Sequence, residues 1–378
     1  MDKIITEDIK TNGVKAVIIG DIHFQYQKLL EADQFTQRCF DHLNSLIDKG
    51  IELDFIVVLG DVFHTHETTK TPVVKKVSDF LIKLCEYAYT YVLIGNHDYI
   101  NKYQYLSDNH AFYPMKHWDL PITIVDKPMI HTIKGKDFVF VPYVPDGRFA
   151  EALSELAKEN SLWEMADCIF SHNLFDGLKM GPKLVEGVES WSTDNPPIIN
   201  GHIHDMQAGI NGDNTINGVF CTGSSTSTSV SDRDSKNIWY TVFDNESDES
   251  DYPYFKTKLL PMDIKNRVVK DYTMNSIINF NLSDYPSEKY EVKINLHGTN
   301  QEFRLFRKKD LYKQLLKNNV KLSYYPTDNK SGSETKDKVL NNVCMERYNF
   351  SNILDELVQS NKSANSGYTK QVYNEIKS

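Results

Sequence analysis

Cysteine is scarce in this chain and long hydrophobic runs are absent, which excludes several classes of protein. The 5 cysteines are scattered, odd in number and include no C-x-x-C pair, as expected for reduced thiols and not for a disulfide framework or a sulfur-rich zinc site. No apolar run approaches the ~20 residues that a helix needs to cross a bilayer. Residues 1–8 are too polar for a signal peptide. The sequence therefore predicts a cytoplasmic protein without a membrane segment.

Negative charge dominates, but it is unevenly distributed. The formal net charge is -10. Residues 1–260 carry 23 Lys and Arg against 38 Asp and Glu, whereas residues 261–378 carry 19 against 14. An acidic first part suits the binding of metal ions. The basic second part is where a nucleic-acid backbone would be expected to lie.

Short apolar runs alternate with helix-like segments in the first part of the chain. The runs at 14–19, 55–59 and 91–94 are typical of buried strands. Segments 34–51 and 73–87, which lie between them, place apolar residues at helical spacing. Strand, helix and strand in this order predict β-α-β units and a largely parallel sheet buried on both faces.

Further strand candidates follow the first three runs. They lie at 122–125, 138–143, 168–170, 198–199, 218–222 and 238–243. Since the later ones come closer together, with too little chain between them for helical crossovers, we expect a second, more antiparallel sheet packed on the first. The predicted fold class is α/β, a sandwich of two mixed β-sheets flanked by helices.

The pattern changes after Pro261. Residues 290–296 alternate as a strand does, 301–319 predict a basic helix, and 320–325 predict a short strand, which together make a small α/β domain. We therefore divide the chain into a large domain at 1–260, a small domain at 261–326, a polar linker at 327–340 and a C-terminal helical segment at 341–378. The helical segment either docks on its own domain or binds a partner.

Five short motifs rich in metal-binding side chains follow the predicted strands: Gly20–His23, Gly60–His64, Gly95–Asp98, Ser171–Asn173 and Gly201–His204. Because the carboxyl ends of parallel strands meet at one edge of a sheet, the fold would bring Asp21, Asp61 and Asn96 together. Asp, His and Asn ligands without a thiolate suit Mn²⁺, Fe²⁺ or Zn²⁺. A carboxylate such as that of Asp61 can bridge two ions that jointly hydrolyse a phosphoester.

The last motif holds two histidines at positions i and i+2. On a strand, this spacing would place His202 and His204 on the same face. Two neighbouring ions could then each take one imidazole.

The five motifs in this order resemble the calcineurin-like metallophosphoesterase superfamily, whose metal-binding positions are all filled here. By that resemblance the first ion would be held by Asp21, His23, Asp61 and His204. The second ion would be held by Asp61, Asn96, His172 and His202. The resemblance also implies that His97 is the catalytic histidine, in contact with the scissile phosphate or protonating the leaving oxygen, and that Asp98 orients it.

Other features resemble one branch of that superfamily, the SbcD-type nucleases of DNA double-strand-break repair. Gly60–His64 is similar to their second motif, whereas Ser/Thr phosphatases have G-D-x-V-D-R-G there. The Gly-Ser turn at 222–225 and the small α/β domain are similar to their glycine-serine turn and DNA-capping domain. His64 would then contact or support the phosphate, or else simply steady its loop. The spacing and composition resemble versions from bacteriophages and large DNA viruses, which would place the protein in the host cytoplasm.

The SbcD resemblance implies substrates and partners as well. It implies Mn²⁺-dependent exonuclease and endonuclease activity on DNA by a metal-activated hydroxide, a homodimer, and an SbcC-type coiled-coil ATPase as partner. Since the chain has no G-x-x-x-x-G-K-[ST] motif, the ATPase would have to be a separate protein. The candidate DNA contacts are Arg304, Arg307, Lys308 and Lys309, although a basic helix face is often simply solvated.

Two alternatives remain open from the sequence. The same metal site would serve a phosphomonoesterase or a cyclic-nucleotide phosphodiesterase, and a protein with an inactive site could be a DNA-binding scaffold. Histidines outside the motifs are expected to be solvated or to have structural hydrogen bonds; they are His42, His66, His110, His117, His131 and His297.

Overall fold

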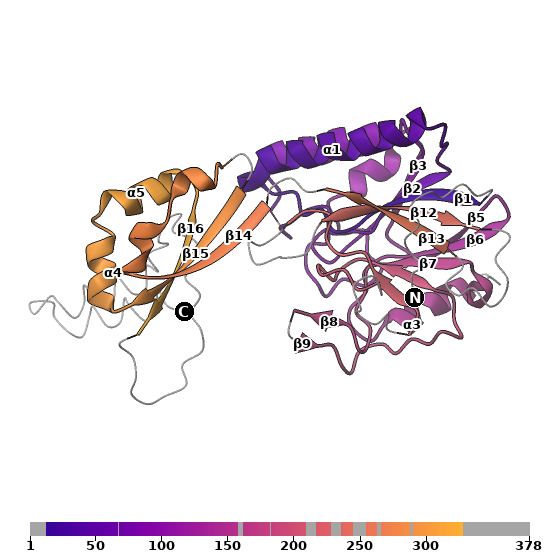
Figure 1. Cartoon of the computed structure of the whole chain (residues 1–378). Coiled ribbons are helices and arrows are strands. Elements are labelled where there is room, and N and C mark those ends of the chain that lie inside the picture. The colour runs from indigo at the N-terminus through magenta and orange to yellow at the C-terminus, as the bar shows by residue number, and fades with distance from the viewer. Residues whose placement is uncertain are drawn as a thin grey trace, which may run out of the picture. The chain divides into compact units, whose positions relative to one another are not determined.

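The computed structural model describes most of the chain as far as residue 327 (Figure 1). The described residues are 13–66, 68–157, 162–181, 183–208, 217–227, 236–244, 255–262, 266–287 and 290–327. The predicted linker, apart from its first residue, and the predicted C-terminal helical segment lie outside them. The chain divides into two compact units, residues 1–266 and 267–378.

The first unit contains a six-stranded sheet with the order β13-β12-β1-β2-β3-β4. The strands are β1 (Val14–Ile19), β2 (Phe55–Val58), β3 (Tyr89–Leu93), β4 (Ile122–Val125), β12 (Asn237–Phe243) and β13 (Phe255–Pro261). Strands β1 to β4 are parallel, and α1 (Leu29–Asp48) and α2 (Thr71–Leu84) make the first two crossovers. The predicted β-α-β units are confirmed. Strand β12 pairs with β1 and β13 in antiparallel fashion, so the sheet is mixed.

The second sheet has the order β11-β10-β7-β6-β5. Its strands are β5 (Met129–Ile133), β6 (Lys136–Val141), β7 (Cys168–Ser171), β10 (Ile198–Asn200) and β11 (Val219–Cys221). The prediction of a more antiparallel sheet was wrong, because only the β5–β6 pair is antiparallel. A parallel connection needs a dozen or more residues but no helix. Helix α3 (Phe149–Ala157) lies in one crossover, while another is largely irregular and carries the short strands β8 (Lys179–Met180) and β9 (Lys183–Leu184).

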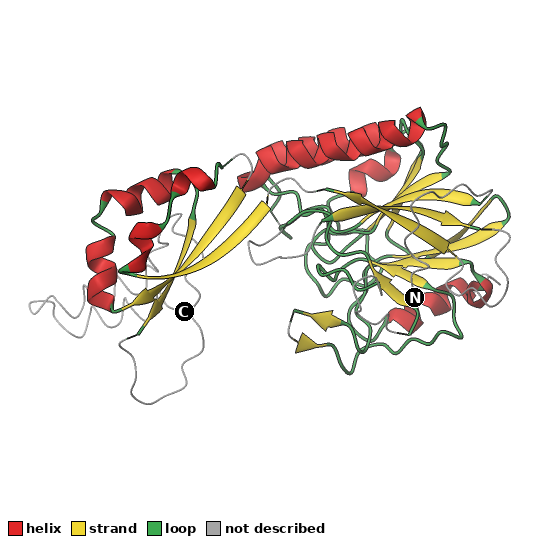
Figure 2. Ribbon diagram, in the orientation of Figure 1, coloured by secondary structure: helices red, strands yellow, loops and turns green. Residues whose placement is uncertain are grey.

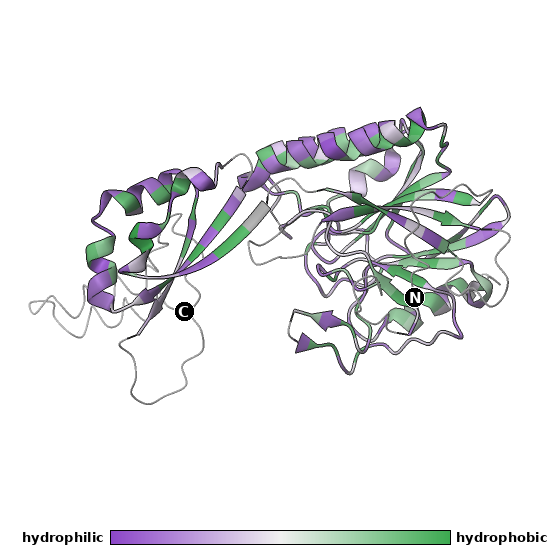
Figure 3. Cartoon of the chain, in the orientation of Figure 1, coloured by the Kyte–Doolittle hydropathy of each residue, from purple (hydrophilic) through white to green (hydrophobic). Residues whose placement is uncertain are grey.

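Figure 2 shows the two sheets of this unit with helices beside them, and three apolar layers hold these elements together. Phe35 of α1 and Phe80 of α2 pack on one face of the first sheet. Phe55, Phe138 and other aromatic residues fill the space between the sheets. The outer face of the second sheet is covered by α3. Figure 3 shows the matching alternation of hydrophobic and hydrophilic residues along α1. This helix–sheet–sheet–helix sandwich buries both faces of each sheet, as the fold class predicts.

The second unit is a three-stranded sheet with two helices. The strands β14 (Asn266–Thr273), β15 (Tyr290–Gly298) and β16 (Lys321–Pro326) follow that order in the sheet. A single helix at 301–319 was the wrong prediction, since the segment forms α4 (Asn300–Phe306) and α5 (Asp310–Lys317). Phe306 and Leu315 both enter the same core. Nine residues apart, they would lie about 180° apart around one straight helix. The break lets both side chains reach the core.

None of the described helices combines the length and the apolar composition that a bilayer crossing requires.

Candidate metal centre

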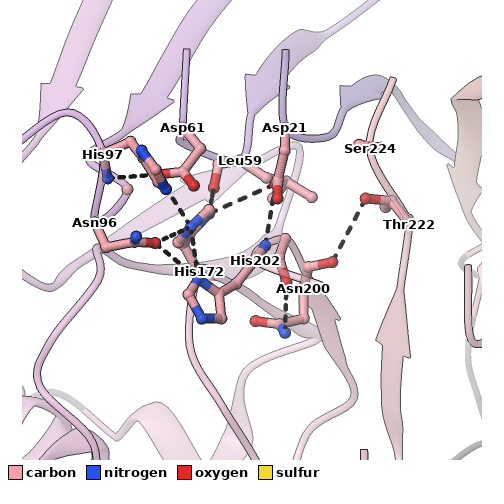
Figure 4. Close-up of polar contacts among 12 residues, drawn as sticks. Asp21, Leu59, Asp61, Asn96, His97, His172, Asn200, His202, Thr222 and Ser224 are labelled. Carbon is pink, nitrogen blue, oxygen red and sulfur yellow. Dashed lines mark hydrogen bonds and ion pairs between the residues drawn. The ribbon is translucent and has the colours of Figure 1, made fainter. Parts of the chain in front are cut away.

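The strand ends bring the motifs together at the rims of the two sheets. Asp21, Asp61 and Asn96 lie just beyond the carboxyl ends of β1, β2 and β3. His172 follows β7 of the second sheet, and the last motif follows β10. The segments therefore converge on one site from both sheets, as Figure 4 shows.

The backbone at this site is tight and partly strained. Gly60 has a φ of 102°, and a Cβ on Gly95 would lie 2.2 Å from the Asp61 nitrogen, so both positions require glycine. Three site residues that are not glycine also have positive φ angles: His23 (52°), Asp61 (48°) and His202 (69°). Such conformations cost about 1–3 kcal/mol each and persist where surrounding structure enforces them.

Four side chains form the first ligand group, namely Asp21, His23, Asp61 and His204. The two Nε2 atoms of His23 and His204 are 3.0 Å apart. Asp61 Oδ2 is 3.6 Å from His23 Nε2, and Asp21 Oδ2 is 3.6 Å from His204 Nε2. Two nitrogens that each lie about 2.1 Å from a shared ion would be roughly 3.0–3.4 Å apart. Asp21 Oδ2 is buried without a hydrogen-bond partner among the described residues, as expected for an oxygen that binds a cation.

The second ligand group consists of Asp61, Asn96, His172 and His202. His202 Nδ1 lies 2.8 Å from Asn96 Oδ1 and 3.2 Å from His172 Nε2. His172 Nε2 is 3.2 Å from Asn96 Oδ1 and 3.4 Å from Asp61 Oδ1. The Nδ1–H of His172 donates to the Leu59 carbonyl over 2.7 Å, which directs Nε2 into the group. This geometry also fits a divalent ion.

Asp61 belongs to both groups. Its Oδ2 faces the first and its Oδ1 the second, while the residue is only 2% exposed. All seven predicted ligands therefore lie in two adjoining groups that share one carboxylate. That they bind metal is still a prediction, but the donor types suit a two-ion centre. His97 also lies with His23 and Asp61 in a group of side chains that could hold an ion.

The two histidines of the last motif do not lie on a strand, contrary to the sequence prediction. β10 ends at Asn200, and His202 adopts a left-handed conformation in the loop that follows. The turn sends His202 to the second group and His204 to the first. One histidine for each ion was predicted from strand geometry. The structure assigns one to each ligand group through the turn at His202 instead.

His97 lies beside the two groups with its orientation fixed. Its backbone N–H donates to Asp61 Oδ1 over 2.8 Å, and its Nδ1–H donates to the His64 carbonyl over 2.8 Å. The remaining ring nitrogen, Nε2, is available for chemistry. The His64 ring is nearly parallel to that of His97, at a centroid separation of 5.9 Å.

Asp98 was predicted to orient His97, but its carboxylate binds backbone groups. It accepts hydrogen bonds from the N–H of Phe63 and of Gly95, both over 2.9 Å. Asp98 thus ties the second motif to the third. Any effect on His97 passes through the backbone.

Two residues outside the five sequence motifs also lie at the site. Asn200 exchanges hydrogen bonds with the backbone of Asn173, at 3.0 and 2.9 Å, and so joins the ends of β7 and β10. His66, expected to be solvated or structural, stacks on His97 at 4.6 Å and 15°. One feature of the sequence could have pointed to His66: His64 and His66 are spaced i and i+2, like His202 and His204. The predicted Gly-Ser turn also lies here, with Ser225 N–H donating to the Asp21 carbonyl.

Burial and neighbouring charges shift the acidity of the site. Burial raises the pKa of Asp98 to about 8, aided by the charge of Asp61. Burial alone would lower the pKa of His172, but the carboxylates of Asp61 and Asp21 raise it to about 9. Burial and the charge of His172 lower the pKa of His202 to about 3. In the metal-free site, His172 therefore carries a proton at neutral pH.

The predicted DNA contacts belong to the second unit. Arg304 lies in α4, while Arg307, Lys308 and Lys309 lie between α4 and α5. All four are exposed. Exposure makes them available to a ligand, and their role in binding DNA remains a prediction.

Substitution of the shared carboxylate should affect both ions. We expect Asp61→Asn to lower the bound metal from about two ions per chain to one or none, because the amide cannot bridge two cations. Asp21→Asn is the matched control and should remove chiefly the first ion. Equilibrium dialysis with elemental analysis measures both, after circular dichroism has shown that each variant is folded. Two ions retained by Asp61→Asn would contradict the shared-ligand arrangement.

Metal binding should also depend on pH. Since the pKa of His172 is raised to about 9 in the metal-free site, an ion must displace its proton at any lower pH. From this proton alone, affinity should fall about tenfold for each unit that pH decreases between pH 8 and pH 6.5. Calorimetry in buffers of different ionisation heat would count the released proton. Metal binding with neither proton release nor pH dependence would rule out His172 as a ligand.

Comparison with known proteins agrees with this geometry. The sequence model of the family described as Calcineurin-like phosphoesterase matches residues 14–206. The protein named "Putative phosphoesterase 244L" of Invertebrate iridescent virus 6 is 32% identical over 304 residues, which cover 79% of this chain and 98% of that protein. "Putative phosphoesterase 078R" of Invertebrate iridescent virus 3 is 31% identical over 315 residues, covering 83% and 85%. The chain belongs to the calcineurin-like phosphoesterase family.

Proposed function

We propose that this phosphoesterase is a metal-dependent DNA nuclease of the SbcD type. The main support for hydrolysis is that two ligand groups share Asp61. They lie beside His97, whose backbone N–H donates to the same carboxylate. We propose that the first group binds one divalent ion and the second another. Among the ions that suit these ligands, we propose Mn²⁺ because the resemblance to SbcD-type nucleases implies it. When bound, such ions polarise the phosphoryl group and make water a stronger nucleophile.

His97 would contribute general acid catalysis. Because its Nδ1–H is held by the His64 carbonyl, Nε2 is the atom that can contact the scissile phosphate or give a proton to the leaving oxygen. The His64 ring, parallel to that of His97, would support the phosphate. Asp98 would hold the backbone of the second and third motifs together, since it accepts hydrogen bonds from Phe63 and Gly95.

The second unit supports DNA as the substrate. Its exposed basic residues, Arg304, Arg307, Lys308 and Lys309, offer cations that suit a phosphate backbone. We further propose a homodimer in the cytoplasm that works with an SbcC-type ATPase. The absence of a P-loop motif in the sequence is consistent with such a partner.

A phosphomonoesterase or cyclic-nucleotide phosphodiesterase is the second candidate, because the same metal centre could serve either reaction. The names of the two viral relatives specify a phosphoesterase and no substrate. The exposed basic residues of the second unit favour the nuclease.

Direct assay of DNA cleavage tests the proposal. We expect the protein with Mn²⁺ to degrade end-labelled duplex DNA and to cleave single strands. His97→Gln should lower kcat about 100-fold or more, because it removes the proton donor while the ligand groups stay intact. Elemental analysis of the variant should show unchanged metal content. Hydrolysis of p-nitrophenyl phosphate or a cyclic nucleotide with no cleavage of DNA would establish the second candidate instead.

A further inference from the structure

A pocket lies beside the candidate metal centre and has no role in the chemistry described above. Its volume is about 500 Å³. The lining residues come from the loops after the second and third motifs; they are Thr65, His66, Thr68, Ile100, Asn101 and Lys102. Pockets of this size hold small organic ligands, and a nucleotide falls within the range.

The pocket adjoins the proposed position of the scissile phosphate. His66, one of its walls, stacks on His97 at a centroid separation of 4.6 Å. A group in the pocket would therefore be a close neighbour of a phosphate held by His97. On a polynucleotide, that neighbour is the next nucleotide along the strand.

The two loops are held in place. His66 Nδ1–H donates to the Tyr99 carbonyl over 3.3 Å, which joins one loop to the other. Tyr99 is fully buried. The backbone N–H of the next residue, Ile100, donates to the Asn109 carbonyl over 3.1 Å. The Thr65 hydroxyl closes its own turn by donating to the Thr68 carbonyl over 2.7 Å. These hydrogen bonds hold the described residues of the two loops before a ligand arrives, which reduces the entropy cost of binding.

The lining suits an anion with a partly apolar body. The described lining residues supply one ammonium, two hydroxyls, an imidazole and an amide. Asn101 Oδ1 already accepts the Tyr103 N–H over 3.0 Å, so its NH₂ group is what it can offer to a ligand. Ile100 is 44% exposed and supplies apolar surface. A sugar-phosphate combines an anionic phosphate with a partly apolar sugar.

We propose that this pocket binds the nucleotide adjacent to the scissile phosphodiester. Lys102 and the amide of Asn101 hold its phosphate, and Ile100 and His66 contact its sugar or base. The inference rests on the proposed nuclease function. It gives the enzyme a means to prefer a phosphodiester within a strand to an isolated phosphoester, because an isolated phosphoester leaves the pocket empty.

Three thymidine dinucleotides that differ by one phosphate test the subsite. They are TpT, pTpT and TpTp. We expect wild-type protein with Mn²⁺ to cleave one of the two phosphorylated forms with a kcat/KM about tenfold above that of TpT, through a charge-assisted contact. Lys102→Met should abolish this advantage, so that neither phosphorylated form is cleaved faster than TpT. Asn101→Asp, which keeps the oxygen that accepts from Tyr103 and replaces the donor by a carboxylate, should have the same effect. Lys49→Met, at the exposed end of α1, is the matched control and should keep the advantage.

A second measurement separates failure of the subsite from failure of the proposed function. Inhibition of bis(p-nitrophenyl) phosphate hydrolysis by the same dinucleotides reports binding whether or not DNA is cleaved. Tighter inhibition by one phosphorylated form, lost in Lys102→Met, supports the subsite. Equal inhibition by all three dinucleotides, or an advantage that survives both pocket variants, overturns it. DNA left intact while the aryl diester is hydrolysed refutes the nuclease function, and the inhibition pattern still decides whether the pocket binds a nucleotide.

Discussion

The sharing of one buried carboxylate between two ligand groups is the interaction on which the rest of the site depends. Burial works against the charge of Asp61, yet the nearby imidazole of His172 and other neighbours keep its pKa well below the usual range. A bare carboxylate in that position calls for cations on both sides. The parallel order of β1, β2 and β3 places Asp61 between Asp21 and Asn96, and the second sheet supplies the histidines that complete each group. The sandwich thus brings together ligands that are far apart in the sequence.

This arrangement is costly, and the surrounding structure stabilises it. Asp61 and His202 adopt left-handed conformations, and Asp21 Oδ2 is buried without a partner among the described residues. Asp98 and Asn200 offset part of this cost, because they accept hydrogen bonds from the backbone of neighbouring motifs. Divalent ions would relieve the remaining electrostatic strain, since they satisfy the facing nitrogens and oxygens together. Folding and metal binding are therefore expected to be coupled.

Local sequence patterns predicted the parts of the structure that depend on local physics. Apolar runs ending in polar motifs located β1, β2 and β3, and the rule that parallel strands end at one edge predicted that the candidate ligands would meet. Features set by longer-range packing were not predictable in the same way. The strand direction in the second sheet depends on how the irregular segment at 172–197 crosses back. The break after Phe306 depends on a core that both halves of the segment must reach. His66 stacks on His97 because the loop after the second motif brings it to the third, and the spacing of His64 and His66 alone does not predict that contact.

Electron paramagnetic resonance of the protein loaded with Mn²⁺ tests the central claim most directly. Two Mn²⁺ ions that share Asp61 would lie about 3.5–4 Å apart, close enough for detectable exchange coupling of their spins. The account predicts an exchange-coupled dinuclear spectrum at full loading. The spectrum of isolated, uncoupled Mn²⁺ at the same loading would contradict it, because the two groups would then bind ions that share no ligand.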